Sequence, residues 1–458
     1  MIGTLGILLS LALLIFLAYR GITVLILAPL LAMVAVLFNG GVPVLASYTE
    51  VFMTSFAGYA KSYFPLFLLG AIFGKVMDDS GSAKSIAETI VKALGKDKAI
   101  LAIVLSCALL TYGGVSLFVV AFAVYPIAAA LFKEADIPKS LIPGAIALGS
   151  FTFTMTALPG TPQIQNAIPM PYFGTDTYAA PILGLMAAMI MFGGGVGWLN
   201  FRARRAQKQG KGYGVEEQKT NATNHENLPG FLTAFLPVIL VLGLNFMFSK
   251  LLFPQMDLSY LQSAPYNTTA EKVIGQWSLI LAVGLGIVGT MALHWKRFAK
   301  PTESLNQGAL GSLLAVINTC SEVGYGNVIS KLPAFDMIKN SMLGISNNPL
   351  ISESISISVL AGITGSASGG MSIALEILGD SYLQMAQAVN LNPEVLHRVA
   401  TVACGSLDAL PHNGAVITLL AICGLSHKQS YADIGMVAVV IPVAATASVV
   451  VLGSLGVV

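Results

Sequence analysis

The stretch Ala400-Thr-Val-Ala-Cys-Gly-Ser-Leu-Asp-Ala-Leu-Pro-His-Asn-Gly414 decides the fold class, because it places an acid, an imidazole and an amide inside an apolar run. These polar side chains are Asp408, His412 and Asn413, and the proline and final glycine disfavour an unbroken helix around them. Polar groups and irregular backbone at membrane depth are tolerated only where protein buries them or a water-filled cavity meets them. The stretch therefore predicts a broken helix beside a cavity.

The composition of the whole chain agrees with a membrane protein. Of its 458 residues, 55% are hydrophobic and 10% are charged, against roughly 25% charged residues in soluble domains. Apolar stretches long enough to cross a bilayer, about 20 residues each, recur along the sequence. We therefore expect an all-α polytopic membrane protein.

Two further breaks are predicted in the first half of the chain. Residues 99–132 carry no charge, and as one helix they would measure about 51 Å, against roughly 30 Å for the hydrocarbon core. Gly113 and Gly114 lie near the middle of this run, so we expect a re-entrant hairpin or a discontinuous helix there. A polar break follows in Ala147-Leu-Gly-Ser-Phe-Thr-Phe-Thr-Met-Thr-Ala-Leu-Pro-Gly-Thr-Pro162.

The breaks recur in register in the second half. Tyr112-Gly-Gly-Val-Ser-Leu117 matches Ser368-Gly-Gly-Met-Ser-Ile373, and a Gly-Ser pair follows the first glycine of each segment after 36 residues. Ala157-Leu-Pro159 likewise corresponds to Ala409-Leu-Pro411. Matching breaks in two halves are typical of transporters with internal repeats. The predicted units are a first inverted repeat 1–200, a cytoplasmic linker 201–229 and a second inverted repeat 230–458.

The positions of Lys and Arg set the expected orientation. An Arg-rich segment starts at Arg202, directly after an apolar stretch, and places residues 201–229 in the cytoplasm by the positive-inside rule. Lys296 and Arg297 follow a later apolar stretch, and the same rule places them in the cytoplasm as well. These assignments favour two inverted repeats, and a parallel duplication with one extra span is the alternative.

The four predicted breaks lie at residues 111–116, 152–166, 364–372 and 406–418, and all are rich in small and hydroxyl-bearing residues. Broken helices expose backbone N–H groups that attract an anion, and hydroxyls complete its coordination. Close helix packing is the alternative reason for such glycines. The expected substrate-binding residues are Gly113, Gly114, Ser116, Thr156, Pro159, Gly160, Thr161, Ser368, Gly369, Gly370, Ser372 and Asn413.

Ionisable side chains in these apolar regions are candidates for the coupling proton. Asp408 and His412 are four residues apart, and a carboxylate near an imidazole in a cavity can accept a proton. Glu322, between apolar stretches, is a third candidate. The alternative makes Asp408 a helix cap and His412 a packing residue. We expect His397 and Arg398 at the membrane interface.

Missing motifs exclude several classes of function. The sequence has no P-loop, no His-Glu-x-x-His motif and no nucleophile elbow, so ATP-driven transport and the hydrolases that use these motifs are not expected. Basic stretches interleaved with aromatic residues are absent, which argues against nucleic acid as a partner. We expect no catalytic residue, cofactor or metal centre.

Three segments carry a resemblance to a known family: Gly-Gly-Val-Ser-Leu-Phe-Val-Val-Ala-Phe-Ala-Val-Tyr-Pro126, Ala-Leu-Pro-Gly-Thr-Pro162 and Cys-Gly-Ser-Leu-Asp-Ala-Leu-Pro-His-Asn-Gly414. Over essentially its whole length the chain resembles the gluconate permease (GntP-type) family of the ion transporter superfamily, in particular the hydroxybutyrate-permease-like branch. The resemblance implies proton-linked import of small hydroxy acids across the bacterial inner membrane by a multi-pass homodimer. It also implies an elevator mechanism, with paired hairpins and broken helices holding the substrate.

One departure from the family bears on the substrate. Gluconate-type members carry His-Pro-Gly-Pro in the first break, whereas this chain has Leu158-Pro-Gly-Thr-Pro162, which favours a smaller and more apolar acid. We expect a secondary active transporter that imports a small hydroxy or keto monocarboxylate, 3-hydroxybutyrate-like or gluconate-like, by proton symport. The alternatives are a sodium symporter with Asn166, Asp408 and Asn413 as ligands, a passive anion channel, and a membrane-embedded enzyme that uses Asp408 and His412.

Overall fold

The computed structural model describes residues 2–20, 22–115, 117–214, 228–411 and 413–458, and this part of the chain is helical and contains no strand. The predicted all-α architecture is confirmed. Within the described residues, five helical segments are long and apolar enough to cross a membrane, by length and composition. They are Val44–Asp79, Pro181–Lys208, Phe231–Gln255, Ala270–Leu293 and His427–Ser454.

The first half contains two initial helices, one long helix, a helical hairpin and a broken segment. The long helix α4 continues α3 through a π-helical stretch at Ser47–Phe52. Helices α6 and α7 lie side by side, joined at residues 113–116, and form hairpin 1. The bounds are α1 Ile2–Tyr19, α2 Val24–Leu37, α3 Val44–Ala46, α4 Met53–Asp79, α5 Ser82–Leu94, α6 Ala99–Tyr112, α7 Leu117–Glu134, α8 Ile142–Ser150, α9 Phe153–Thr156, α10 Ile164–Ala167, α11 Met170–Phe173 and α12 Pro181–Lys208.

The second half has the same order of elements. Helices α13 and α14 precede the long α15, and α17 and α18 pack together as hairpin 2. The chain then breaks again between α19 and α20. The bounds are α13 Phe231–Phe246, α14 Ala270–Leu293, α15 Pro301–Ser330, α16 Phe335–Leu343, α17 Pro349–Thr364, α18 Ala367–Ala388, α19 Pro393–Leu407, α20 Gly414–Cys423, α21 His427–Gly435 and α22 Ile441–Ser454.

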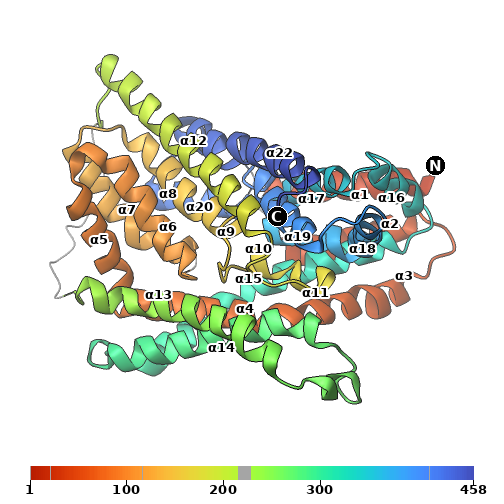
Figure 1. Cartoon of the computed structure of the whole chain (residues 1–458). Coiled ribbons are helices and arrows are strands. Elements are labelled where there is room, and N and C mark those ends of the chain that lie inside the picture. Colours follow the sequence, from red (N-terminus) through yellow and green to blue (C-terminus); the bar gives the residue numbers. More distant parts are fainter. Residues whose placement is uncertain (1, 21, 116, 215–227, 412) are drawn as a thin grey trace.

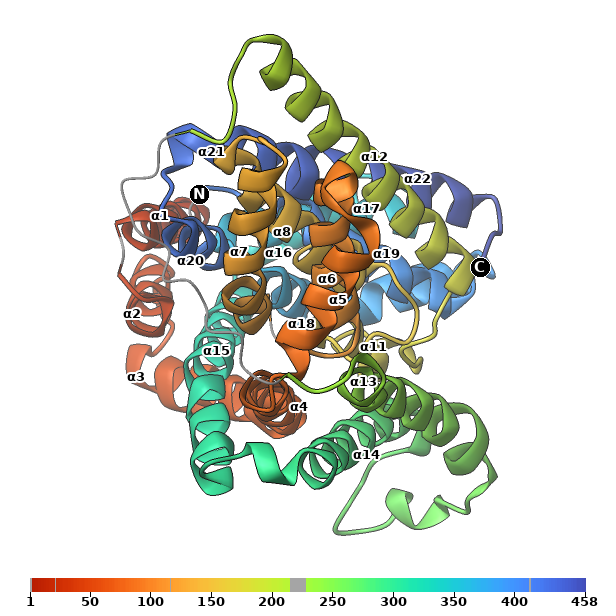
Figure 2. The ribbon, with the colours of Figure 1, turned by 90° about the vertical axis from the view of Figure 1, so that its left-hand side faces the viewer.

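Long helices form two layers around the hairpins (Figure 1, Figure 2). Helices α4, α13, α14 and α15 run along the lower side, and α12 and α22 run along the upper side. Helix α4 packs along α15, and α12 packs along α22. Hairpin 1 and hairpin 2 lie between these layers, toward opposite ends of the molecule. The broken segments are therefore enclosed on two sides by continuous helices.

Glycines end the first arm of each hairpin. Gly114 has φ +96° and Gly365 has φ +63°, backbone conformations that residues with a side chain rarely adopt. In hairpin 2, Gly370 faces the backbone of Ala361, so the two arms approach more closely than a Cβ atom would allow. The turn and the close approach thus explain why the sequence carries glycines at these positions.

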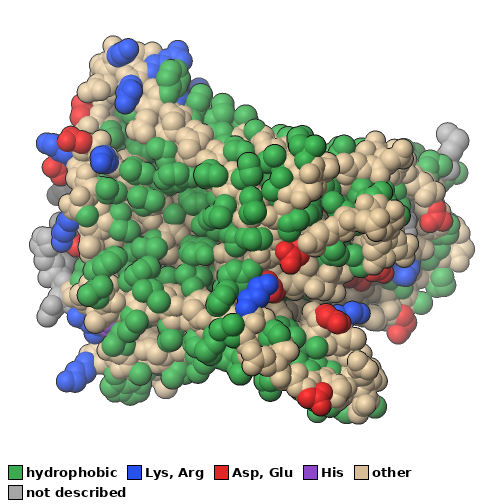
Figure 3. Space-filling model, in the orientation of Figure 1, with side chains coloured by type: hydrophobic (Ala, Val, Ile, Leu, Met, Phe, Trp, Pro, Cys, Tyr) green, Lys and Arg blue, Asp and Glu red, His purple; other side chains and the backbone are tan. Residues whose placement is uncertain are grey.

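The outer surface suits a bilayer. Large apolar side chains such as Ile182, Leu232 and Val288 are exposed along α12, α13 and α14. Figure 3 shows hydrophobic side chains over the flank of the molecule and Lys and Arg side chains gathered at one end, where α5 and the end of α12 lie. A continuous apolar surface with basic residues at one end is typical of a membrane protein.

The segment predicted as a linker begins as a helix. Helix α12 runs to Lys208 and so includes the first eight residues of 201–229. Arg202 in this extension binds Asp433 of α21 at 2.8 Å. Arg, Lys, Gln and Ala favour helix, so a charged composition by itself does not end one. Residues 215–227 of the predicted linker lie outside the described residues.

Gly370→Ala is expected to destabilise the protein by about 1–3 kcal/mol, because the new Cβ would meet the Ala361 backbone and force the hairpin arms apart. The measurement is the thermal unfolding midpoint of the purified protein in detergent. Gly311→Ala in α15 is the matched control, since nothing lies within 4 Å of its Cβ position. Equal midpoints for the two variants would contradict the close approach of α17 and α18.

Candidate functional site

The turn of hairpin 1 lies directly on the first broken segment, which we call break 1 (residues 151–163). The Tyr112 hydroxyl donates to the Pro159 carbonyl at 2.8 Å, and Gln163 Nε2 donates to the Thr111 carbonyl at 2.7 Å. A Cβ on Gly114 would lie 3.0 Å from the Pro162 ring. The structure therefore brings the predicted residues Gly114 and Pro159 together.

Gly113 has a different environment from its neighbour. A Cβ built on it would lie 2.6 Å from the Val238 side chain, so Gly113 packs against α13. In this conformation the glycine permits a helix contact, which is the packing alternative for such positions.

Break 1 is a buried turn with one free hydroxyl. Gly160 has φ +80°, and its N–H donates to the Thr177 carbonyl at 2.8 Å. The Thr156 hydroxyl donates to the Thr152 carbonyl. Thr161 is fully buried, and its hydroxyl has no hydrogen-bond partner among the described residues. Of the predicted threonines, Thr161 is the one with an unused polar atom.

Arg398 of α19 is fully buried and donates to the Thr156 carbonyl of break 1. None of the hydrogen bonds and ion pairs described for this side chain involves a carboxylate. The guanidinium instead donates to carbonyl groups of break 1 and of the loop that follows α11, which lie outside regular helix. Its acceptors are Thr156 O at 3.4 Å, Thr177 O at 3.5 Å, Ala179 O at 2.6 and 3.1 Å, Asn166 Oδ1 at 3.2 Å and Thr401 Oγ1 at 3.5 Å.

His397 completes this contact between the halves. Its Nε2 atom lies 3.2 Å from Asn166 Oδ1, and its Nδ1 atom lies 2.6 Å from the Thr175 hydroxyl. Both His397 and Arg398 are fully buried in the protein, and their place at the membrane interface stays a prediction. Arg398 donates to the Thr156 carbonyl of break 1, whereas His397 contacts the side chains of Asn166 and Thr175.

At hairpin 2 the centre of the site is Glu322 of α15. Its carboxylate lies against the Cα of Gly369, close enough to exclude any side chain there. Glu322 is buried, and its Oε2 atom has no hydrogen-bond partner in the described part of the chain. The Ser366 hydroxyl accepts the Gly369 N–H at 3.0 Å and lies 3.5 Å from the Ser368 hydroxyl. Gly369 and the carboxylate thus form one local arrangement.

Ser372 lies two turns into the α18 region of hairpin 2 and faces the first half. It is buried and close to the Tyr59 hydroxyl of α4. Neither hydroxyl has a partner that meets hydrogen-bond geometry within the described residues. The Tyr63 ring is tilted against that of Tyr59, with 4.5 Å between ring centroids, and its hydroxyl donates to the Ile168 carbonyl, five residues after break 1. These tyrosines of α4 lie between hairpin 2 and the segment that follows break 1.

The second broken segment, break 2 (residues 408–413), meets the turn of hairpin 2. Asn413 Nδ2 donates to the Gly365 carbonyl at 2.8 Å, and its Oδ1 accepts the Val416 N–H at 2.9 Å. Asp408 ends α19, is partly exposed, and its Oδ1 has no partner in the described chain. Two predicted residues, Ser116 and His412, lie outside the described residues.

The helices on either side of break 2 also contact the first half. A Cβ on Gly405 of α19 would lie 2.9 Å from the Thr156 side chain, and Arg398 reaches the Thr156 carbonyl from the same helix. Helix α20, which follows break 2, packs along α7 of hairpin 1. Break 1 thus contacts α19, and the helix after break 2 contacts hairpin 1. Unpartnered oxygens in the described residues of the breaks, the hairpins and α15 include those of Thr111, Thr161, Glu322, Ser372 and Asp408.

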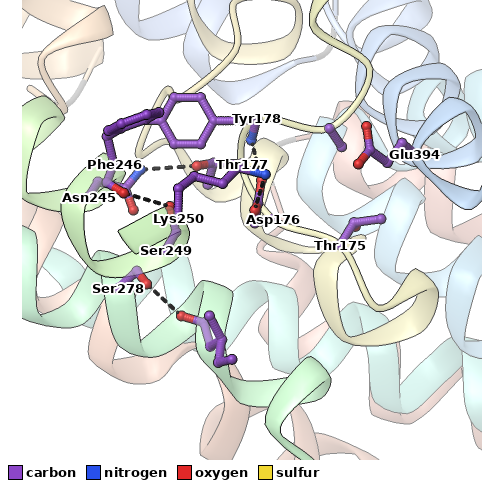
Figure 4. Close-up of polar contacts among 12 residues, drawn as sticks. Thr175, Asp176, Thr177, Tyr178, Asn245, Phe246, Ser249, Lys250, Ser278 and Glu394 are labelled. Atoms are coloured by element: carbon purple, nitrogen blue, oxygen red, sulfur yellow. Dashed lines mark hydrogen bonds and ion pairs between the residues drawn. The ribbon is translucent and has the colours of Figure 1, made fainter. Parts of the chain in front are cut away.

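The loop after α11 contacts α13 and the π-helical stretch Met247–Leu252 that continues it, as Figure 4 shows. Asp176 forms an ion pair with Lys250 at 2.7 Å, and Asn245 Nδ2 donates to the Thr177 hydroxyl at 3.0 Å. On the other side, Glu394 of α19 accepts the Ala180 N–H at 3.0 Å. Contacts from two different helices thus fix the loop that begins after α11.

A cavity of about 260 Å³ opens beside Glu322, between α1 and α2 on one side and α15, α16 and hairpin 2 on the other. Its wall is apolar except at Glu322, Tyr325 and Thr364. Such a space suits the hydrocarbon part of a small acid better than its carboxylate.

Arg398→Ala is expected to destabilise the protein by at least about 3 kcal/mol, because buried carbonyls left without a donor cost about 1–3 kcal/mol each. Unfolding midpoints of the purified protein in detergent measure this loss. Arg398→Lys should recover only part of it, since an ammonium cannot serve carbonyls in several directions as a guanidinium does. Arg204→Ala, at an exposed position of α12, is the control. An Arg398→Ala midpoint equal to that of the control would contradict the assigned role.

Comparisons with known proteins agree on one family. The family described as "GntP family permease" matches residues 2–455. A Bacillus subtilis (strain 168) protein named "Uncharacterized transporter YxjC" is 49% identical over 447 residues, covering 93% of this chain and 94% of that protein. An "Uncharacterized transporter" of Haemophilus influenzae is 26% identical over 358 residues, covering 75% of this chain and 74% of the relative.

A solved structure shares the fold. The crystal structure of the Alcanivorax borkumensis YdaH transporter matches with a TM-score of 0.55 at 14% sequence identity, covering 90% of each chain. This likeness concerns the fold alone and confirms a polytopic helical transporter architecture. Since the matching family consists of permeases, the chain is a transporter and not an enzyme. From residue 2 to residue 455, the chain belongs to the GntP family of permeases.

Proposed function

We propose that the chain is a secondary active transporter that imports a small hydroxy or keto monocarboxylate together with protons. The observation that carries the proposal is the buried Glu322 carboxylate, which lies against Gly369 with one oxygen unpartnered in the described chain. A buried carboxylate without a counter-charge is costly, and a proton removes that cost. Asp408 in break 2 supplies a second acid, and His412 stays a predicted partner.

The anion is proposed to bind where break 1 faces hairpin 2. The hydroxyls of Thr161 and Ser372 have no partner in the described chain and can donate to a carboxylate. The charge of Arg398 behind break 1 favours an anion there. Ser366 and Asn413 already accept N–H groups at the N-termini of α18 and α20. Fewer backbone N–H groups than expected from the sequence are therefore left for the anion, and hydroxyl groups supply more of its hydrogen bonds.

Protons fit the site better than sodium does. The carbonyl oxygen of Asn166, a proposed sodium ligand, accepts from both Arg398 and His397. The Asn413 oxygen is used as a helix cap. A cation at Asn166 would also be repelled by the Arg398 guanidinium, which lies 3.2 Å from that oxygen. Proton symport is therefore the preferred coupling.

We further propose inverted repeats, an elevator movement, a homodimer and a place in the bacterial inner membrane. The recurrence of the element order supports a duplication, and the location of the hairpins toward opposite ends supports inversion. The relatives from Bacillus subtilis and Haemophilus influenzae support a bacterial setting. The basic residues at one end, near α5 and the end of α12, would face the cytoplasm.

The test is uptake of labelled 3-hydroxybutyrate, gluconate, lactate and pyruvate into proteoliposomes that contain the full chain. A proton gradient and a sodium gradient are imposed separately. Accumulation above equilibrium under the proton gradient supports symport. Accumulation under the sodium gradient alone would mean that sodium, not the proton, is the coupling ion. If every acid only equilibrated across the membrane, the protein would be a channel.

Asp408→Asn is expected to abolish accumulation driven by a proton gradient, because an amide cannot take up the proton, while exchange of labelled substrate across the membrane survives. Exchange and accumulation are measured in the same proteoliposomes. Asp97→Asn, an exposed position before α6, is the control. If Asp408→Asn accumulates substrate as the unmodified protein does, the proton is carried elsewhere, and Glu322 is the next residue to replace.

A further inference from the structure

Hairpin 2 contains an acid that none of the functional assignments above uses. Glu353 lies in the second turn of α17, and its exposed fraction is 0%. Both carboxylate oxygens lack a hydrogen-bond partner among the described residues. A carboxylate in this position would be an isolated buried charge, whereas the carboxylic acid is neutral and has one O–H group to satisfy.

The neighbours of Glu353 provide no counter-charge in the described chain. Tyr382 of α18 is the titratable side chain that faces it. On α19, Glu394, His397 and Arg398 are all bonded to residues of the first half. Helix α22 has no charged residue, Asp336 of α16 is exposed, and the side chain of Lys339 on α16 lies outside the described part of the structure. Burial with no described cation beside the carboxylate favours the protonated form of Glu353 in this conformation.

Hydroxyl groups lie near Glu353 on the side of the α16–α17 loop. The Ser352 hydroxyl donates to the Ser346 carbonyl at 3.0 Å, in a loop whose neighbouring residues are exposed. The Tyr382 hydroxyl donates to the Ser352 carbonyl at 3.4 Å and lies close to Ser356. Water that entered between these groups could connect Glu353 with the surface.

Helix α17 also carries hydroxyls farther along the chain, toward break 2. Ser356, one turn after Glu353, has a buried hydroxyl without a partner in the described structure. On another side of the helix, the Ser406 hydroxyl of α19 donates to the Ser358 hydroxyl at 2.7 Å. Glu353 is thus a buried acid in a helix that is rich in hydroxyl groups.

Counted back from the ends of their first arms, the two hairpins differ at the level of this acid. Glu353 lies eleven residues before the end of α17, and the residue eleven positions before the end of α6 is Leu101. The first hairpin therefore places an apolar side chain at the equivalent level. The second hairpin carries a costly acid there, which points to a functional reason.

We propose that Glu353 is a proton-binding site whose occupation allows the arms of hairpin 2 to close. With the hairpin loosened, water would reach Glu353, and the carboxylate would take up one proton to become the carboxylic acid. Closure buries that neutral acid, and release of the proton on the other side restores the carboxylate. The inference deepens the proposed proton symport and rests on it for the transport role, but the binding of the proton itself does not depend on a substrate.

Infrared difference spectroscopy of the full chain in lipid tests the protonation state directly. The C=O stretching band of a protonated carboxyl group is recorded at neutral pH for the unmodified protein and for Glu353→Gln. We expect part of this band to be lost in Glu353→Gln, whose amide matches the neutral acid in shape and should preserve the fold. Asp380→Asn, an exposed acid on the other arm of the hairpin, should leave the band unchanged. A band that Glu353→Gln does not change overturns the proposal.

Transport of labelled 3-hydroxybutyrate forms the second part of the experiment. Glu353→Gln should lose accumulation under a proton gradient and retain exchange, while Asp380→Asn keeps both. If Glu353→Gln loses the band but accumulates substrate normally, Glu353 does not carry a coupling proton and the proposal falls. If the unmodified protein itself shows no proton-driven accumulation, the proposed symport fails, and the infrared result still decides whether Glu353 binds a proton.

Discussion

The structure depends on one constraint: where a helix breaks inside a membrane, its freed carbonyl and amide groups must find partners within the protein. In this chain the partners are side chains from other segments. Gln163 serves the turn of hairpin 1, Asn413 serves the turn of hairpin 2, and Arg398 serves the backbone around break 1. Each turn and each break is therefore stable only in the presence of its counterpart, which ties the two halves into one folded unit.

The charged side chains divide unevenly between the two halves. Glu322, Glu353 and Asp408, the acids with unpartnered oxygens among the described residues, all belong to the second half. In the first half, break 1 and hairpin 1 offer hydroxyl groups and backbone, backed by the positive charge of Arg398. The arrangement suits the proposed transport, in which break 1 and Ser372 contact the anion and acids of the second half hold protons. The two halves share an order of elements and differ in their chemical environments.

The local sequence was sufficient to predict where helices break, but it was not sufficient to predict which side chains contact one another across the breaks. Gly113, Gly114 and Pro411 predict their breaks because glycine allows backbone conformations that other residues avoid, and proline restricts φ and removes an N–H donor. The burial of Arg398 could not be predicted, since a charge in the first turns of a helix looks the same whether lipid headgroups or carbonyl groups surround it. The contact of Glu322 with Gly369 joins residues far apart in the chain, and no local pattern encodes it.

The loop that follows break 1 is held unequally on its two sides. Toward α19 it is held by the buried donors of Arg398, and each carbonyl left without its donor costs about 1–3 kcal/mol. Toward α13 it is held by the buried Asn245 amide, which donates to the Thr177 hydroxyl, and by the partly exposed pair of Asp176 and Lys250. An exposed ion pair of this kind is worth about 0–1 kcal/mol. High salt would therefore loosen the pair of Asp176 and Lys250 first and leave the buried bonds of Asn245 and Arg398 in place.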